Sequence, residues 1–234
     1  MTAFPVDRDH PPRAIAYRDA THAIVMRSWN ADDVDAFLEA FDESRPELRA
    51  FLNWAHLPNS RVDQAKLFAR FAANYLTGAD FVVGLFDDGG RVLGGAGLHA
   101  RVPLNPRGWE IGYWVRSSCT KRGYATLVTQ VLTAFAFDWL DADRVQILVD
   151  DANLPSARVA EKAGFALEGV MRNALTALGD DMREAGHRGS GRVRLYAMTP
   201  EDLPALPWLG RIRASLRVTD ALGGEHRGGP DFTE

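Results

Sequence analysis

The chain has 234 residues, a length that suits one large domain or one domain with extensions. Its formal net charge of -4, with 25% charged residues, gives no sign of a nucleic-acid-binding surface, and no apolar run is long enough to cross a membrane. The single cysteine, Cys119, excludes an internal disulfide framework and favours a reducing compartment. No signal-peptide pattern stands at the N-terminus, so we expect a cytoplasmic protein. We expect no bound metal, because the six histidines show no metal-ligand spacing.

The first part of the chain is predicted to be mostly helical. Residues 1–20 are rich in Pro, Asp and Arg, show no period, and are expected to form an irregular arm. The hydrophobic pattern then predicts, in chain order, a strand at 22–29 and helices at 30–41, 43–55 and 59–78. Asn30 is the expected N-cap of the first helix, Pro46 is expected near the start of the second, and Gly78 closes the third.

From residue 80 the pattern changes to extended segments. The expected elements are strands at 80–86, 91–102 and 108–115, a helix at 123–140, a strand at 144–150, a helix at 154–164, and strands at 165–177 and 191–199. A polar, Gly-rich loop is predicted at 178–191, a short helix around 202–216 and a disordered tail after it. This order predicts an α+β fold in which helices flank a mixed, mostly antiparallel sheet, and not a doubly wound α/β fold.

The stretch "IGYWVRSSCTKRGYATLVTQVL" (111–132) places a strand, a turn and a helix in immediate succession. Apolar side chains from Tyr124 onward recur at helical spacing, which by itself indicates only a core helix. The turn has no Asp or Asn cap, and it brings Lys121, Arg122 and Gly123 to a helix start whose first backbone N–H groups are unpaired. Free N–H groups, flanking cations and a glycine that permits close approach suit a phosphate group. The P-loop signature is absent, so a nucleotide hydrolase has little support.

Two stretches carry a family resemblance. "WEIGYWVRSSCTKRGYATLVTQVL" (109–132) resembles the acetyl-coenzyme A signature of the GNAT acetyltransferase superfamily, whose Gln/Arg-x-x-Gly-x-Gly/Ala turn aligns with residues 120–125. "VDDANLPSARVAEKAGFALEGV" (149–170) is similar to the second half of the family's site. The segment 44–55 and the Ile-Gly-Tyr-Trp run resemble, more narrowly, the branch of ribosomal-protein alanine/serine N-terminal acetyltransferases.

The resemblance implies a GNAT-like domain at 21–199, with an arm at 1–20 and a C-terminal extension at 200–234. It also implies acetyl-coenzyme A as the co-substrate. The residues that it implies for coenzyme binding are Val115, Thr120, Lys121, Arg122, Gly123, Tyr124, Ala125, Thr126 and Asn153. Among them, the N–H of Val115 is the expected donor to the thioester carbonyl. Thr120 stands where the family has Gln or Arg.

Acetyl transfer needs a proton acceptor for the amine and a donor for the departing thiolate. Glu110 is the candidate acceptor, directly or through a water, and its alternative is a structural carboxylate. Ser156 is the candidate donor, and its alternative is a helix-start serine that satisfies a backbone N–H. Many family members carry a Tyr at the position of Ala160, and the close branch carries a Glu at the position of Leu175. These departures predict that catalysis depends mostly on proximity.

The expected reaction is transfer to a primary amine, and the resemblance points to a protein N-terminal amino group. One alternative acceptor is a small amine, such as an antibiotic, a polyamine or an amino-acid derivative. A coenzyme A-binding module without turnover is the other alternative. We expect no nucleic-acid or membrane partner, and the family suggests a homodimer.

Overall fold

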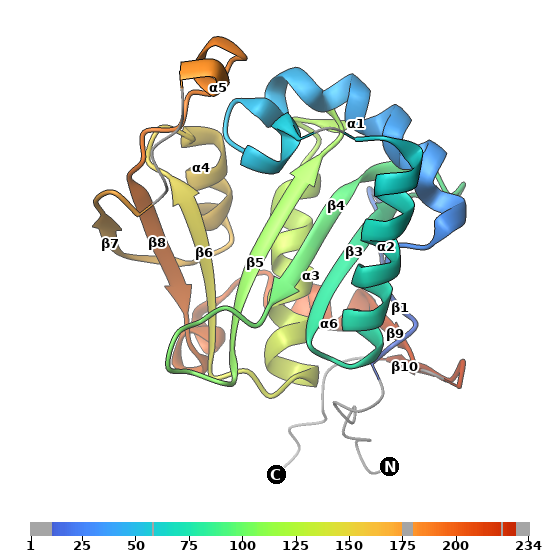
Figure 1. Cartoon of the computed structure of the whole chain (residues 1–234). Helices are drawn as coiled ribbons and strands as arrows, with labels where there is room; N and C mark the ends of the chain where they lie inside the picture. Colours follow the sequence, from blue (N-terminus) through green and yellow to red (C-terminus); the bar gives the residue numbers. More distant parts are fainter. Residues whose placement is uncertain (1–10, 58, 175–179, 221, 228–234) are drawn as a thin grey trace.

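The computed structural model describes residues 11–57, 59–174, 180–220 and 222–227. Ten strands form one sheet in the order β10-β9-β1-β2-β3-β4-β5-β6-β8-β7 (Figure 1). In chain order they are β1 (Ala14–Arg18), β2 (Ala23–Ser28), β3 (Asp80–Phe86), β4 (Val92–His99), β5 (Gly108–Val115), β6 (Arg144–Asp150), β7 (Ala166–Met171), β8 (Val193–Met198), β9 (Leu216–Thr219) and β10 (Glu225–Arg227). Neighbouring strands are antiparallel except for β5 and β6, which are parallel. The predicted mixed, mostly antiparallel sheet is confirmed.

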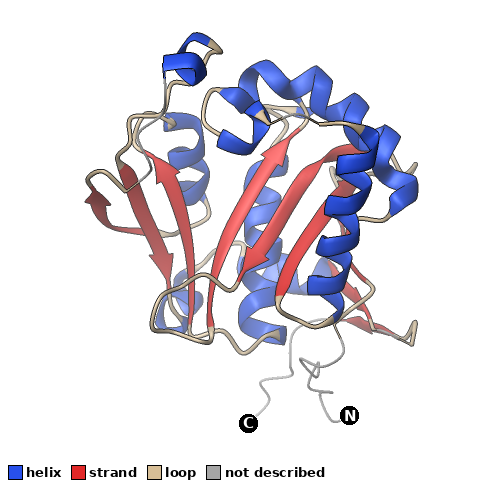
Figure 2. Ribbon diagram, viewed as in Figure 1, coloured by secondary structure: helices blue, strands red, loops and turns tan. Residues whose placement is uncertain are grey.

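Helices cover the sheet on two sides (Figure 2). One side, the α1/α2 face, carries α1 (Val34–Arg49) and α2 (Arg61–Leu76), which pack on β2, β3 and β4. The other, the α3/α4 face, carries α3 (Tyr124–Trp139), α4 (Leu154–Lys162) and α6 (Leu209–Ser215). The short helix α5 (Asp180–Glu184) precedes β8. The 3₁₀ segments are η1 (Ala31–Asp33), η2 (Asn53–His56), η3 (Ser117–Cys119) and η4 (Pro200–Ala205).

Side-chain alternation along β5 fills both faces, as expected for a strand with helices on each side. Trp109 and Ile111 belong to the larger core under α3, whereas Trp114 belongs to a smaller aromatic core under α1 and α2. Every residue of α3 from Leu127 to Ala136 is buried. This helix is therefore the central support of the sheet, and its start is held in a fixed place at the end of β5.

Two N-terminal segments differ from the prediction. Residues 14–18, expected in an irregular arm, form β1. Ile15 and Tyr17, two positions apart, both point into the core, which is the alternation of a strand with one buried face. The helices expected at 30–41 and 43–55 are mainly one helix, α1, with Pro46 inside its last turns. A proline so near the helix end removes one intrahelical hydrogen bond. The apolar stripe of α1 packs continuously past it.

The C-terminal segments also differ. The helix expected at 202–216 divides into η4 and α6, because Pro204 and Pro207 interrupt the run, and the chain then turns into β9. Residues 225–227, expected in a disordered tail, form β10, and α5 lies within the expected loop at 178–191. The rest of the predicted tail, residues 228–234, lies outside the described residues.

Helix α1 holds the turn that follows β5. Glu43 accepts hydrogen bonds from Arg116 Nε (2.6 Å) and from the backbone N–H of Ser118 (2.8 Å). Glu39 accepts from the same guanidinium at 2.6 Å, and Ser44 Oγ accepts from the N–H of Ser117 at 3.0 Å. The hydrogen bond from Arg116 is the main reason why the pKa of Glu43 is lowered to about 2. The Glu43 carboxylate is therefore ionised and, through these hydrogen bonds, holds the turn after β5 against α1.

This lowered pKa predicts an acid-sensitive contribution to stability. A group whose pKa falls from 4.5 to about 2 on folding stabilises the fold above its unfolded pKa and loses that effect as the pH drops toward the folded value. Between about pH 5 and about pH 3, we expect the free energy of unfolding to fall less for Glu43→Gln than for the wild type, measured by urea denaturation. Asp42→Asn, on the exposed side of α1, is the control and should follow the wild type. Equal pH slopes for Glu43→Gln and the wild type would contradict the assignment.

Candidate functional site

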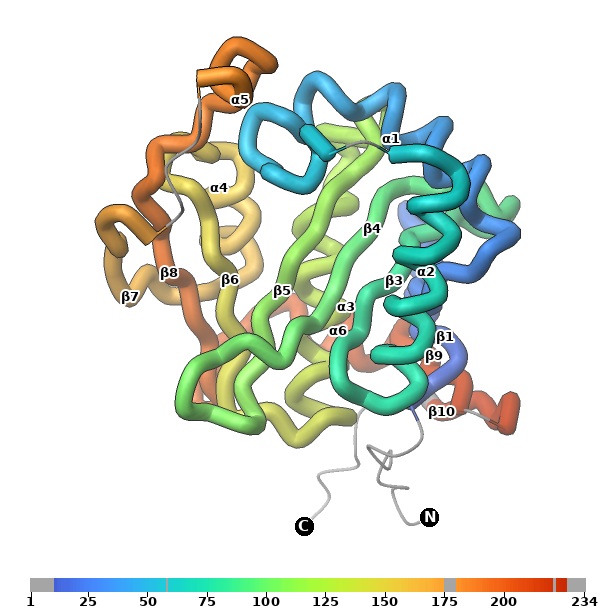
Figure 3. Tube along the Cα trace, viewed as in Figure 1, coloured from blue at the N-terminus to red at the C-terminus, as the bar shows by residue number. Residues whose placement is uncertain are grey.

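The sheet opens between β5 and β6. These strands pair only from Gly108 to Glu110, opposite residues 144–146. Beyond that level β5 continues to Val115 and β6 to Asp150, but the two strands are no longer paired with each other and diverge (Figure 3). We call this opening the splay. Because a strand edge without a partner leaves backbone N–H and C=O groups available, the splay presents hydrogen-bonding groups in the middle of a sheet.

The direction of the N–H groups along β5 follows from its pairing with β4. The N–H of Arg116 donates to the carbonyl of Leu93 at 2.8 Å, on the β4 side. Successive residues of an antiparallel strand direct their N–H groups to opposite edges. The N–H of Val115 therefore points into the splay, which is the direction that its expected donor role requires.

The turn at residues 120–126 leads from β5 into α3. Gly123 is the N-cap of α3 with φ +86°, and Lys121 also has a positive φ of 60°. In the described part of the chain, the backbone N–H groups of residues 121–126 have no hydrogen-bond acceptor. The side chains of Lys121 and Arg122 are exposed beside them. A run of free N–H groups at the positive end of a buried helix, flanked by two cations, is suited to an anion.

Two further contacts fix this turn. His22 Nε2 lies 2.8 Å from the carbonyl oxygen of Arg122, which ties the turn to the start of β2. The hydroxyl of Thr120 donates to the carbonyl of Ser117 at 2.8 Å. The Thr120 side chain therefore stabilises the turn itself. Tyr124 is buried against the His22 ring, with ring centroids 5.2 Å apart, whereas Ala125 and Thr126 are half-buried.

On the α1/α2 face, Glu110 lies at the closed end of the splay. Gln146 Nε2, from the paired residue of β6, donates to Glu110 Oε2 at 3.2 Å. The next residue of β5 on this face is Gly112, and its partner in β4 is Gly97. Because neither position carries a side chain, the pair forms a low floor beside the Glu110 carboxylate, and the His99 ring stands over it.

On the α3/α4 face, two hydroxyl groups meet. Tyr113 Oη, from β5, and Ser156 Oγ, from the first turn of α4, are 2.9 Å apart. Burial raises the pKa of Tyr113 to about 12, so this phenol stays protonated at neutral pH. Asn153 Oδ1 accepts from the N–H of Ser156 at 3.3 Å and is the N-cap of α4. Because Asn153 provides the cap, the Ser156 hydroxyl is left to interact with Tyr113.

The structure thus brings together residues that sequence reasoning assigned and two that it missed. Tyr113 and Gln146 were missed because their roles depend on which strand lies beside β5 and on where α4 starts, and no local pattern encodes either. Ala160, the position of the family tyrosine, is fully buried in the core. Leu175 lies outside the described residues.

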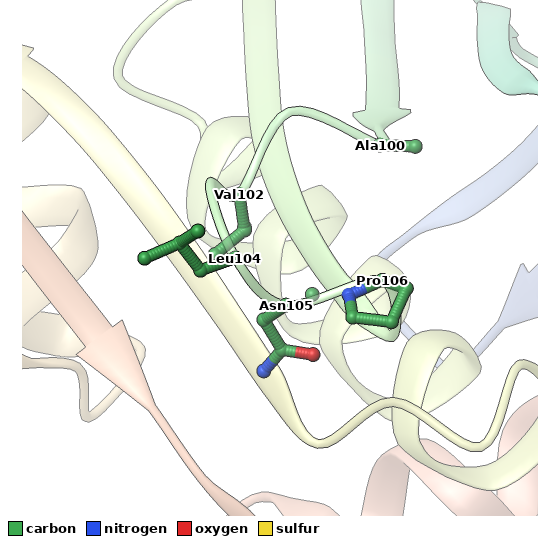
Figure 4. A pocket seen from close by; sticks show the side chains of 6 residues that line it. Ala100, Val102, Leu104, Asn105 and Pro106 are labelled. Atoms are coloured by element: carbon green, nitrogen blue, oxygen red, sulfur yellow. The ribbon is translucent and has the colours of Figure 1, made fainter.

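A separate hollow of about 370 Å³ lies beside the connection between β4 and β5 (Figure 4). Its lining residues are Ala100, Val102, Leu104, Asn105, Pro106 and Gly108. None of these side chains is ionisable, and the hollow adjoins the start of β5, where β5 and β6 are still paired. It therefore offers no acid–base chemistry, and we place the candidate site at the splay.

The described residues offer neither a metal centre nor a membrane span. None of their His, Cys, Asp and Glu side chains forms a group of three or more that could hold a metal ion. No helix in the described part of the chain is both long and apolar enough to span a lipid bilayer.

Comparison with known proteins identifies the family. Residues 23–166 match the model described as "Acetyltransferase (GNAT) domain". A curated relative from Bacillus subtilis (strain 168), named "Putative ribosomal N-acetyltransferase YdaF", is 28% identical over 153 residues, which cover 65% of this chain and 82% of the relative.

Solved structures share the fold. Mycobacterium smegmatis RimJ in complex with CoA-disulfide is 22% identical with a TM-score of 0.71, over 83% of this chain and 92% of RimJ. RimL, described as a ribosomal L7/L12 alpha-N-protein acetyltransferase in complex with coenzyme A, is 22% identical with a TM-score of 0.67, over 79% of this chain and 97% of RimL. With the family model covering strands β2 to β6 and both sides of the splay, the chain belongs to the GNAT acetyltransferases, enzymes that transfer an acetyl group from acetyl-coenzyme A to an amine.

Proposed function

We propose that this enzyme acetylates the α-amino group of a protein N-terminus. The observation that carries the proposal is the open α1/α2 face beside the splay. Helices α1 and α2 pack on β2, β3 and β4, and no described helix covers β6 and β8 on this side (Figure 1). On this side of β6, Leu148 is 39% exposed, whereas Gln146 and Asp150 are buried. Near the end of β6, the N–H of Arg188 donates to the carbonyl of Ala50 at 2.8 Å, so the segments after α1 and before β8 meet there. An acceptor can lie across the sheet at the level of Leu148, below this contact.

The names of the relatives support this acceptor class. YdaF is named as a ribosomal N-acetyltransferase, and RimL is described as an alpha-N-protein acetyltransferase. A small-molecule acceptor would be better served by a site enclosed on several sides, since ligand pockets bury most of a small ligand's surface. The open face favours the protein acceptor over the small-amine alternative.

The turn at 120–126 fits the diphosphate of the coenzyme. Its free N–H groups and the exposed side chains of Lys121 and Arg122 supply donors and positive charge, and Gly123 supplies the φ that the turn needs. The pantetheine arm would then lie along the splay, where the N–H of Val115 can donate to the thioester carbonyl as charge develops on its oxygen. Asn153 would act indirectly, by capping α4 beside the arm.

The pair Ser156–Tyr113 and the pair Glu110–Gln146 supply the proton transfer and the acceptor binding that the reaction still needs. On the α3/α4 face, the Ser156 hydroxyl donates a proton to the departing thiolate and is resupplied by Tyr113, 2.9 Å away. On the α1/α2 face, the Glu110 carboxylate, fixed by Gln146, attracts the acceptor's ammonium group. The proton of that ammonium must pass to a base, which is Glu110 itself, a water that it orients, or another group on this face. The cytoplasmic location and the homodimer stay predictions.

The acceptor class is tested with a panel of amines. With acetyl-coenzyme A, we expect thiol release with peptides that have a free N-terminus and none with the same peptides blocked at the α-amino group. Mass spectrometry should place the acetyl group on the α-nitrogen. Turnover of polyamines, aminoglycosides or free amino acids without turnover of any peptide would refute the proposal. Coenzyme binding without turnover of any amine would also refute it.

The coenzyme turn is tested at Gly123. A β-branched residue is strained at φ +86°, so we expect Gly123→Val to weaken coenzyme A binding at least about 10-fold, measured by calorimetry. Gly223→Val is the matched control, because Gly223 has φ +90° in the turn between β9 and β10, at the edge of the sheet. Equal affinities for the two variants would contradict the role of the turn.

The thiolate donor is tested with Ser156→Ala and Tyr113→Phe. Each should lower kcat about 10- to 100-fold and leave the affinity for coenzyme A near the wild-type value, because a general acid acts only as the bond breaks. Glu110→Gln should instead raise the KM of the peptide acceptor, because it removes a charge that attracts the ammonium group. Ser215→Ala, at the end of α6, is the control. A wild-type kcat for Ser156→Ala would remove Ser156 from the mechanism.

A further inference from the structure

A row of four polar residues crosses the sheet at the closed end of the splay. Asp80 of β3 is paired with His99 of β4, His99 with Glu110 of β5, and Glu110 with Gln146 of β6. Directly paired residues on adjacent strands point to the same face. All four side chains therefore stand on the α1/α2 face, the side on which the acceptor is proposed to lie.

Within this row, Asp80 and His99 form a carboxylate–imidazole pair. His99 Nδ1 lies 2.8 Å from Asp80 Oδ1, and the two side chains are only 15% and 19% exposed. A carboxylate at Nδ1 holds the proton on that nitrogen and leaves the lone pair on Nε2. Among the described residues, none forms a hydrogen bond with His99 Nε2. Nε2 itself is not fully buried.

Two glycines leave room for the imidazole beside the splay. A Cβ placed on Gly97 would lie 2.8 Å from His99 Nε2, and one placed on Gly112 would lie 3.3 Å from it. Nε2 therefore lies above the Gly97–Gly112 pair, one step nearer the open end of the splay than Glu110 is. Gly112 belongs to the part of β5 that has lost its β6 partner. The lone pair of Nε2 thus stands over the floor on which the acceptor nitrogen has to reach the thioester.

We propose that His99 is the proton acceptor for the acceptor amine and that Asp80 holds its imidazole in the required tautomer. This inference rests on the proposed function. The ammonium group, held by Glu110, passes one proton to His99 Nε2, which gives a neutral amine and an imidazolium. The amine nitrogen bonds to the thioester carbon as the carbon–sulfur bond breaks. The nitrogen of the new amide loses its second proton to water, and the Ser156–Tyr113 pair regains from water the proton that it gave to the thiolate. The imidazolium also returns its proton to water, so that amide, thiol and one proton are the net products.

Proton affinity favours an imidazole over a carboxylate for this step. An α-amino group has an ordinary pKa of about 7.7–8.0, an imidazole about 6.5 and a glutamate carboxyl about 4.3. General bases act best when their pKa lies near the operating pH. The charged groups around His99 are Asp80 on β3 and Glu110 on β5, with the exposed Arg101 two residues further along the chain. In the described structure, no hydrogen bond, ion pair or ring contact joins His99 to α1 or α2.

The test uses the full-length enzyme, acetyl-coenzyme A and a peptide with a free N-terminus. At neutral pH we expect His99→Gln to lower kcat/KM about 100-fold with unchanged coenzyme A affinity, and Asp80→Asn to lower it in the same direction. The deficit should shrink above about pH 9, where the amine is already deprotonated in solution. In His99→Ala, added imidazole should restore part of the rate. A purely structural role for His99 would give neither the pH dependence nor the rescue.

The chain offers a matched control in a second pair of the same type. His226 Nε2 lies 2.8 Å from Asp220 Oδ2. Strand β10, which carries His226, is an edge strand of the sheet and lies six strands away from β5. His226→Gln should keep the wild-type rate and pH profile. A His99→Gln enzyme with the wild-type profile at every pH would overturn the proposal while leaving the proposed function intact. If the wild type turns over no N-terminal peptide, the proposed function fails, and the role of His99 fails with it.

Discussion

The loss of pairing between β5 and β6 beyond Glu110 is the constraint on which the site depends. Parallel strands connected through a helix normally stay paired along their length, because unpaired backbone groups inside a fold are costly. Here β5 is anchored from the other side by six residue pairs to β4, and β6 by six to β8, so each strand keeps one full partner. The sheet can therefore stay open between β5 and β6 while both strands remain held in place, and the unpaired N–H groups become available to a ligand.

The two ends of the splay differ in electrostatics. At the open end, the start of α3 presents free N–H groups and cations, which suit a diphosphate. At the closed end, the carboxylate of Glu110 and the amide of Gln146 stand on the α1/α2 face, and the two hydroxyl groups of Tyr113 and Ser156 meet further along the splay on the other face. In the proposed function, the anionic part of the coenzyme and the cationic acceptor would be drawn to opposite ends of the same opening, with the thioester between them.

Sequence patterns predicted the parts of this arrangement that are local. The strand–turn–helix from Trp109 to Trp139 and the helix that begins at Leu154 follow from periodicity and turn chemistry, and the structure has both. The cap that Asn153 provides for that helix was not predicted. The short strands β1 and β10 were not predicted, because five or fewer residues give too little alternation when their pairing is long-range. The contacts of Tyr113, Gln146 and His99 join residues from different elements and depend on strand order, which the pattern of a single segment does not contain.

Glycines in β4 and β5 determine which side chains can pack beside the splay. The run "GGAG" at 94–97 and the glycine of "IGYW" are weak strand formers, and their cost in the sheet needs a compensating gain. Gly97 and Gly112 face each other, and together they make room for the His99 ring, which stands over them. A Cβ at Gly94 or Gly95 would instead meet Trp114, at 2.2 Å and 2.5 Å. The glycines are therefore explained by the side chains and backbone that pack against them, and at Gly97 and Gly112 that side chain is His99.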